Sequence, residues 1–216
     1  MRKILFVAIL MASPTLFAKE DIDKVNGAIR TQAGVEYGDL DTVNGSISIA
    51  DGTRADSAST VNGSIDVGNQ AIVGSLETVN GGVDIGEAVA VERGVETVNG
   101  AVDIARGTRV QGKVETVNGR IELEAAEVEK GLSTVNGDIE VGADSIVRGG
   151  ILIEKPNGGW FNWNSNSRVP RVVIGPNAVV EGTLKFEREV ELFVHTTAKI
   201  GPVDGATAKS FSGQEP

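Results

Sequence analysis

Apolar and polar residues alternate in short runs that recur every 18 or 19 positions through most of this 216-residue chain. In one run, Ile65 and Val67 flank the polar Asp66. A period of two residues predicts a β-strand with one buried face. Equivalent apolar pairs stand at Ile47/Ile49, Val83/Ile85, Val102/Ile104, Ile121/Leu123 and Ile139/Val141. Each repeat therefore contains this strand at the same place.

Each repeat has two further apolar positions, such as Val73 and Leu76. Glycine-bearing turns separate these positions and β-branched residues dominate, which disfavours a helix. About three short strands per repeat indicate an all-β fold, a single-stranded, three-sided parallel β-helix of about 8–10 coils with 18–19 residues each. At ~4.8 Å per coil, such a rod would be roughly 50 Å long.

The tripeptide Val-Asn-Gly marks the same point of each coil, in seven copies. A hairpin-based barrel also uses Asn-Gly turns, but its two strands would occupy different phases of a longer repeat. Equivalent copies favour stacked coils, because so short a unit cannot bury its own apolar face. The asparagines are Asn26, Asn44, Asn62, Asn80, Asn99, Asn118 and Asn136, and the glycines are Gly27, Gly45, Gly63, Gly81, Gly100, Gly119 and Gly137.

Stacking gives both residues of the Asn-Gly pair a structural role. Asparagine side chains about 4.8 Å apart on neighbouring coils can bond to one another as a ladder. Glycine reaches positive φ without a Cβ clash and asparagine tolerates the left-handed region, so we expect the pair to turn a corner in that conformation. The threonines that precede the tripeptide, such as Thr78, predict a parallel column of hydroxyl groups.

Composition divides the chain into five segments. Residues 1–18 combine two cations, an apolar run and a small final residue, which is typical of a cleaved signal peptide, and the run is too short to span a bilayer. We expect the Val-Asn-Gly solenoid at 19–154, a loop insertion rich in aromatic residues and asparagine at 155–171, C-terminal coils and a cap at 172–208, and a polar tail at 209–216.

Charge and cysteine content restrict the possible partners. The formal net charge is −10, and removal of Arg2 and Lys3 with the signal peptide makes it −12. Such a surface repels phosphate backbones, so no nucleic acid is expected as a partner. The chain has no cysteine, which excludes disulfides and thiolate metal sites. No later segment is long and apolar enough for a transmembrane span.

Two carboxylate columns accompany the repeat. One comprises Asp66, Asp84, Asp103, Glu122 and Glu140, and the other Asp41, Glu77, Glu96, Glu115 and Glu154. The columns indicate a solvated face that discourages aggregation, or a cation site at Asp66, Asp84 and Asp103, since Ca²⁺ binds several oxygens. No dedicated calcium motif is present, so we expect no metal or other cofactor.

The insertion holds Trp160, Phe161 and Trp163. Such rings can stack on sugars or anchor a partner protein, or they can fold back over the solenoid wall. His195 is the only histidine and has no evident catalytic partner. With no nucleophile motif and no loops to wall a cleft, we expect no enzyme.

The coil Thr-Val-Asn-Gly-x-Ile-x-Val, over residues 23–154, resembles the adhesin-type β-solenoid domain of exported bacterial proteins. Residues 173–182, Val-Ile-Gly-Pro-Asn-Ala-Val-Val-Glu-Gly, are similar to the rungs of bactofilins, which are polymer-forming β-helix proteins. These resemblances imply a β-solenoid and bring no catalytic residue to these positions.

We therefore expect an exported, non-enzymatic β-solenoid that acts as a structural or adhesin-like binding scaffold in the periplasm or on the surface of a bacterium. One alternative is a carbohydrate-binding or vestigial lyase-like β-helix that uses the Trp160/Trp163 loop. Another is a head-to-tail polymer. The corresponding partners are an envelope protein, a glycan or a second copy of the chain.

Overall fold

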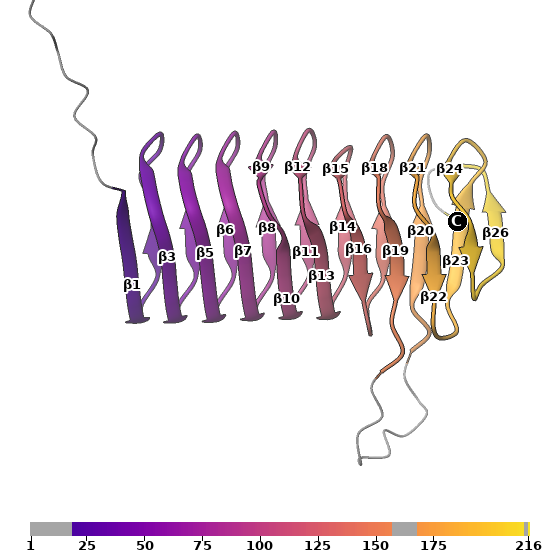
Figure 1. Cartoon of the computed structure of the whole chain (residues 1–216), viewed down its shortest axis with the longest axis horizontal. Helices are drawn as coiled ribbons and strands as arrows, with labels where there is room; N and C mark the ends of the chain where they lie inside the picture. Colours follow the sequence, from indigo (N-terminus) through magenta and orange to yellow (C-terminus); the bar gives the residue numbers. More distant parts are fainter. Residues whose placement is uncertain (1–18, 157–167, 214–215) are drawn as a thin grey trace, which may run out of the picture.

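The computed structural model describes residues 19–156, 168–213 and 216. It confirms the all-β prediction: parallel strands wind into a solenoid of about ten turns, with the first coil at one end of the rod and the last at the other (Figure 1). The expected signal peptide and the rings of Trp160, Phe161 and Trp163 lie outside these residues. No helix in the described part could cross a membrane.

One side of the solenoid is a ten-stranded parallel sheet built from the Ile-x-Val runs. Its strands are β2 (Ile29–Arg30), β4 (Ile47–Ile49), β6 (Ile65–Val67), β8 (Val83–Ile85), β11 (Val102–Ile104), β14 (Ile121–Leu123), β17 (Ile139–Val141), β20 (Arg171–Ile174), β23 (Glu191–His195) and β26 (Ala208–Phe211). Each strand pairs in register with the strand one coil away, as in Asp66↔Asp84 and Asp84↔Asp103.

A second, branched sheet forms the other two sides. It begins with the long strands β1 (Glu20–Asn26), β3 (Glu36–Asn44), β5 (Arg54–Asn62) and β7 (Ile72–Asn80). After β7, one branch contains β9 (Ala90–Val91), β12 (Arg109–Val110), β15 (Glu127–Val128), β18 (Ile146–Val147), β21 (Val179–Val180) and β24 (Lys199–Ile200). The other contains β10 (Val95–Asn99), β13 (Lys113–Asn118), β16 (Gly131–Thr134), β19 (Gly150–Ile153), β22 (Leu184–Phe186) and β25 (Val203–Asp204).

The branch point corrects the prediction of three strands in every coil. The early coils have two strands, because a single long strand such as β7 continues around one corner. In β7 the inward Val73 and Leu76 are three positions apart, whereas Val91 and Val95 in the next coil are four apart. The added residue opens the corner, so β9 and β10 are separate strands that both pair with β7. Three strands per coil is correct only from this point on.

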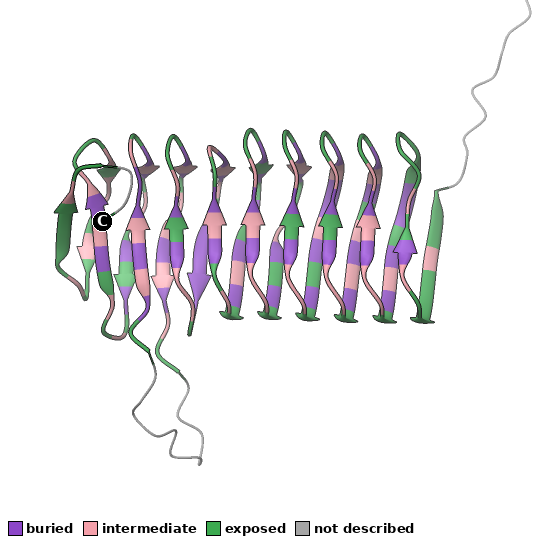
Figure 2. Ribbon diagram, turned by 180° about the vertical axis from the view of Figure 1, so that it is seen from behind, coloured by how far each residue is buried: buried purple, intermediate pink, exposed green. Residues whose placement is uncertain are grey.

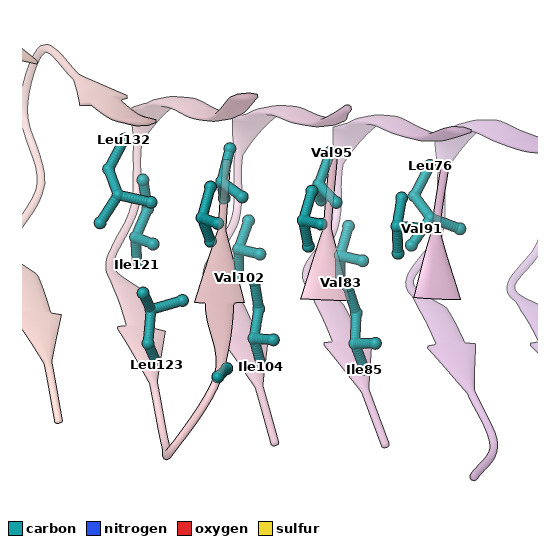
Figure 3. Packing of buried hydrophobic residues seen from close by; sticks show 14 of the residues in the cluster. Leu76, Val83, Ile85, Val91, Val95, Val102, Ile104, Ile121, Leu123 and Leu132 are labelled. Carbon is teal, nitrogen blue, oxygen red and sulfur yellow. The ribbon is translucent and has the colours of Figure 1, made fainter. Parts of the chain in front are cut away.

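Inward side chains from all sides form one continuous core that is aliphatic apart from Tyr37 and Phe186, and Figure 3 shows part of its aliphatic portion. Leu76, Val83 and Val91 come from different strands and pack together in its middle, and all three have no exposed surface. Buried and exposed positions alternate along the strands (Figure 2). Burial of each such side chain contributes about 1.5–3 kcal/mol relative to exposure, so repetition supplies the stability that a single coil lacks.

The C-terminal coils continue the same winding beyond the insertion. Val172 of β20 pairs with Ile139 of β17, so the residues around the insertion return to the register of the coil before it. Lys209–Phe211 belong to β26, which pairs with β23. The prediction of a polar tail from residue 209 is therefore wrong for these three residues, because their backbone extends the sheet by one more strand.

Candidate functional site: the ladder face

The side-chain amides of the seven repeat asparagines form an unbroken hydrogen-bonded ladder. Each Nδ2 donates to Oδ1 of the asparagine one coil earlier, from Asn44 to Asn26 at 3.1 Å through to Asn136 to Asn118 at 3.0 Å. The intermediate bonds, donated by Asn62, Asn80, Asn99 and Asn118, measure 2.9–3.0 Å. The bonds expected from stacked tripeptides are present, and they tie neighbouring coils together at this edge.

The threonines before the tripeptide point inward and bond to backbone carbonyls. Thr78 Oγ1 donates to Gly63 O at 2.9 Å, and Thr97 Oγ1 donates to Gly81 O at 3.0 Å. The hydroxyls are therefore stacked as predicted, but their partners are the glycines of the preceding coil. Because threonine fills the inward position, the valine that follows it must point outward.

Crowding, and not a left-handed conformation, requires glycine in the tripeptide. Only Gly27 among these seven has a positive φ, of 112°. A Cβ at Gly100 would lie 1.8 Å from Gly81 O, and a Cβ at Gly119 would lie 1.8 Å from Gly100 O. The prediction that Asn-Gly turns the corner with positive φ is wrong for every pair after the first. Instead, stacking presses each glycine carbonyl against the Cα of the next glycine in the column.

The left-handed corner lies elsewhere in the coil, after the strands of the ten-stranded sheet. Its members share φ values between 44° and 73° and are Gly34, Gly52, Gln70, Ala88, Gly107, Ala125, Asp144 and Asn177. The N–H groups bond across coils, as in Gln70 N to Glu87 O at 2.8 Å. Only three members are glycines, so no repeated residue type reveals this corner in the sequence.

A column of exposed valines runs beside the asparagine ladder. Its members Val43, Val61, Val79, Val98 and Val117 are 38–41% exposed, which is unusual for valine in a strand. On their other side stand the carboxylates of Glu77, Glu96 and Glu115, and a groove of about 440 Å³ follows the valines and these glutamates. We call the surface made by the asparagine ladder, the valines and the three glutamates the ladder face.

Sequence reasoning missed the exposure of the valines. The signal was available in the alternation of Leu76, Glu77, Thr78 and Val79, of which the first and third are buried. Valine usually lies in the interior, and this tendency hides the inward position of the threonine beside it.

The glutamate column of the ladder face is shorter than the sequence indicates. Strand β19 pairs Leu152 with Ser133 and Ile153 with Thr134. Glu154 therefore lies one position further on, beside Val135 of the preceding coil, where its Oε1 accepts a hydrogen bond from Ser133 Oγ at 3.2 Å. The prediction that Glu154 continues the column is wrong, because the repeat lost its spacing before residue 155.

The second carboxylate column lies on the ten-stranded sheet. Asp66, Asp84, Asp103, Glu122 and Glu140 stand in register, as predicted. Burial, followed by the neighbouring charges of Asp103 and Asp66, raises the pKa of Asp84. Arg120 Nη2 relieves part of the repulsion further along, at 2.9 Å from both Asp103 Oδ1 and Glu122 Oε2.

This column lines a second groove, of about 790 Å³. Within residues 19–156 and 168–213, no set of three or more histidine, aspartate or glutamate side chains is arranged to hold a metal ion. A cation at Asp66, Asp84 and Asp103 thus gains no support from the geometry of the described residues.

An arginine from beyond the insertion meets the C-terminal end of the asparagine ladder. Arg188 Nη1 donates to Asn136 Oδ1 at 2.7 Å and to Val135 O at 3.1 Å. Nothing in the repeat pattern marked Arg188, since it stands outside the tripeptide coils.

His195 is engaged locally at the same end of the rod. Its Nδ1 lies 2.9 Å from Thr197 Oγ1, and its ring packs edge-on against Phe211 with 5.1 Å between centroids. These contacts give the ring a structural role in the last coils.

No model of a protein family matches this chain, and no curated protein or solved structure matches it. The resemblance to adhesin-type solenoids is carried by the repeat alone, and function is inferred from the surfaces above.

Proposed function

We propose that the protein is an exported, non-enzymatic scaffold of the bacterial envelope and that the ladder face binds an extended envelope component. The observation that carries this proposal is the column of exposed valines repeated in register over consecutive coils. The core does not need these side chains, since threonine occupies the inward position beside each of them.

The ladder face offers the same three contacts in every coil. The valine supplies apolar area, the asparagine edge has amide N–H groups, and the glutamate supplies an acceptor and a negative charge. A surface that repeats about every 4.8 Å suits an extended or repeating partner, which can make the same contact many times. Each contact is weak alone, and the number of coils sets the affinity.

The signal-peptide-like composition of residues 1–18 supports an envelope location, and the resemblance of the tripeptide repeat to adhesin-type solenoids supports an adhesin-like role. Two measurements test the proposal. Fractionation of cells with a C-terminally tagged protein should place it in the periplasm or at the surface, and a variant without residues 2–18 should remain in the cytoplasm. A full-length protein that stays cytoplasmic would contradict export.

Binding is tested by cosedimentation of the purified protein with isolated envelopes and with peptidoglycan sacculi. The variant Val79→Ser/Val98→Ser/Val117→Ser should lose most of the binding. The matched control Val173→Ser/Val179→Ser changes valines that face outward on other sides of the solenoid and should bind like the parent. Equal binding by all three proteins would remove the ladder face from the proposal, and loss only on Trp160→Ala/Trp163→Ala would favour the carbohydrate-binding alternative.

A further inference from the structure

We propose that the asparagine ladder contains built-in deamidation sites at Asn99, Asn118 and Asn136, while the earlier Asn-Gly pairs are protected. An asparagine before glycine is the sequence most open to this reaction, because glycine leaves its backbone nitrogen unshielded. The seven pairs share the same two residues, so any difference between them must come from the fold.

The reaction uses only the chain and water. The backbone nitrogen of the glycine loses its proton and attacks Cγ of the asparagine side chain. A bond from nitrogen to Cγ forms, the bond from Cγ to Nδ2 breaks, and ammonia leaves with the proton. Water then opens the cyclic imide at either carbonyl and gives aspartate or isoaspartate. The net change is one water consumed and one ammonia released.

The glycine nitrogens fall into two groups. Those of the first four pairs donate to the asparagine carbonyl of the next coil, at 2.9 Å for Gly27, 3.0 Å for Gly45, 3.1 Å for Gly63 and 3.2 Å for Gly81. The bond lengthens steadily along the rod. Among the backbone hydrogen bonds of the described residues, none is donated by the nitrogens of Gly100, Gly119 and Gly137 to an asparagine carbonyl of the next coil.

The change follows the lengthening of the coil by one step, since Gly81 still donates across the first 19-residue coil whereas no such bond from Gly100 crosses the second in the described residues. The two coils from Asn80 to Asn99 and from Asn99 to Asn118 have 19 residues, where the earlier coils have 18. In the next coil β16 ends at Thr134, whereas β13 continues to Asn118. The corner at Asn118 and Gly119 therefore lacks strand pairing to the coil that follows, whereas Asn99 still pairs with Asn118.

A nitrogen held in a hydrogen bond must break that bond before it can attack. All seven asparagines are exposed, so water reaches each of them. The interior members also share the same side-chain ladder bonds, and these do not distinguish one group from the other. For the interior members, the backbone hydrogen bond of the glycine is the difference that remains, and at Asn136 the guanidinium of Arg188 binds Oδ1 in addition.

The products would weaken the ladder where they form. An aspartate at Asn118 has no N–H to donate to Asn99 Oδ1, and it adds a negative charge on the edge of the ladder face that already carries Glu96 and Glu115. Isoaspartate also lengthens the backbone, which displaces the in-register pairing of β13. Deamidation would thus alter the C-terminal half of the ladder face and leave the N-terminal half intact.

The test is to incubate the purified protein at mildly alkaline pH and physiological temperature and to follow each Asn-Gly peptide by mass spectrometry that separates asparagine, aspartate and isoaspartate. Conversion at Asn99, Asn118 and Asn136 should be several-fold faster than at Asn44, Asn62 and Asn80. In denaturant all of these positions should react at similar rates, which serves as the control for sequence effects. Similar rates in the folded protein, or faster conversion in the N-terminal group, would overturn the proposal.

Discussion

Arg188 meets the last asparagine of the ladder: its Nη1 lies 2.7 Å from Asn136 Oδ1, although the two residues are 52 positions apart. Every earlier Oδ1 in the column accepts an N–H from the next asparagine, and at Asn136 the guanidinium takes that place. The chain therefore ends its hydrogen-bonded column with a charged donor from the coils beyond the insertion.

Removal of this donor should lower stability. Arg188→Ala leaves Asn136 Oδ1 and Val135 O without the guanidinium, and we expect a loss of about 1 kcal/mol in the free energy of unfolding, measured by urea denaturation. Arg168→Ala is the matched control, because it removes the exposed guanidinium that pairs with Asp138 and keeps the Arg168 carbonyl that Arg188 Nη2 contacts, so it should change stability by less than about 0.5 kcal/mol. An equal loss of unfolding free energy in the two variants would show that Arg188 does not stabilise the end of the ladder.

A break in the middle of the ladder should be detectable as well. Asn80→Ala removes the bonds to Asn62 and from Asn99, and should cost about 1–2 kcal/mol of unfolding free energy. Gln111→Ala removes an exposed amide that lies off the ladder and should be close to neutral. The same urea titration measures both, and a neutral Asn80→Ala would mean that the ladder adds nothing to stability.

The two kinds of corner should respond differently to alanine. At Gly100 a Cβ would collide with Gly81 O, so Gly100→Ala should cost more than about 4 kcal/mol or prevent folding. At Gly52, with φ of 65°, a Cβ meets open space, and Ala88 already holds this conformation two coils later. Gly52→Ala should therefore cost only about 1–2 kcal/mol. Soluble yield and unfolding free energy check the difference, and a tolerated Gly100→Ala would contradict the crowding.

The acidic column predicts an unusual pH dependence at Asp84. Because the pKa of this carboxyl is raised, the folded state binds its proton more tightly than the unfolded state does. This contribution favours folding at acid pH and is lost as pH rises through the raised pKa. Asp84→Asn should thus be more stable than the parent at neutral pH, with a difference that shrinks on acidification and at high salt.

Unfolding free energies over a pH series measure this difference. Glu87→Gln removes one exposed carboxylate outside the column and should show a smaller gain. An advantage of Asp84→Asn that persists at low pH would argue against its cause being the ionised Asp84 carboxylate, which is disfavoured first by burial and then by the charges of Asp103 and Asp66.

The features that all coils share could be predicted from the sequence. The pair Ile65/Val67, repeated at one spacing, predicts the inward face, and the recurring Asn62 and Asn80 predict the ladder. The differences between coils could not be predicted from the sequence. The split of β7 into two strands depends on one added residue near Glu92, and the register of Glu154 depends on where the repeat begins to fail.

Other features depend on packing that no pattern records. Position 100 requires glycine because the carbonyl of Gly81, on the neighbouring coil, approaches its Cα closely. The sequence alone does not show this contact. Ala88 and Gln70 have left-handed backbone conformations, and neither alanine nor glutamine is a residue type from which positive φ would be predicted. The exposure of Val79 follows from the inward position of Thr78, which was readable from the alternation but competes with the usual burial of valine.

The central claim, that consecutive coils stack in parallel and in register, is tested most directly with engineered cysteines in this cysteine-free chain. Val79 and Val98 lie side by side on adjacent coils, within the ~4.4–6.8 Å separation of Cα atoms that a disulfide needs, whereas Val79 and Val117 are two coils apart. Under mild oxidation, Val79→Cys/Val98→Cys should form an intramolecular disulfide, and Val79→Cys/Val117→Cys should keep both thiols free by titration and mass spectrometry. Failure of the first pair, or bridging of the second as readily as the first, would contradict the stacked solenoid.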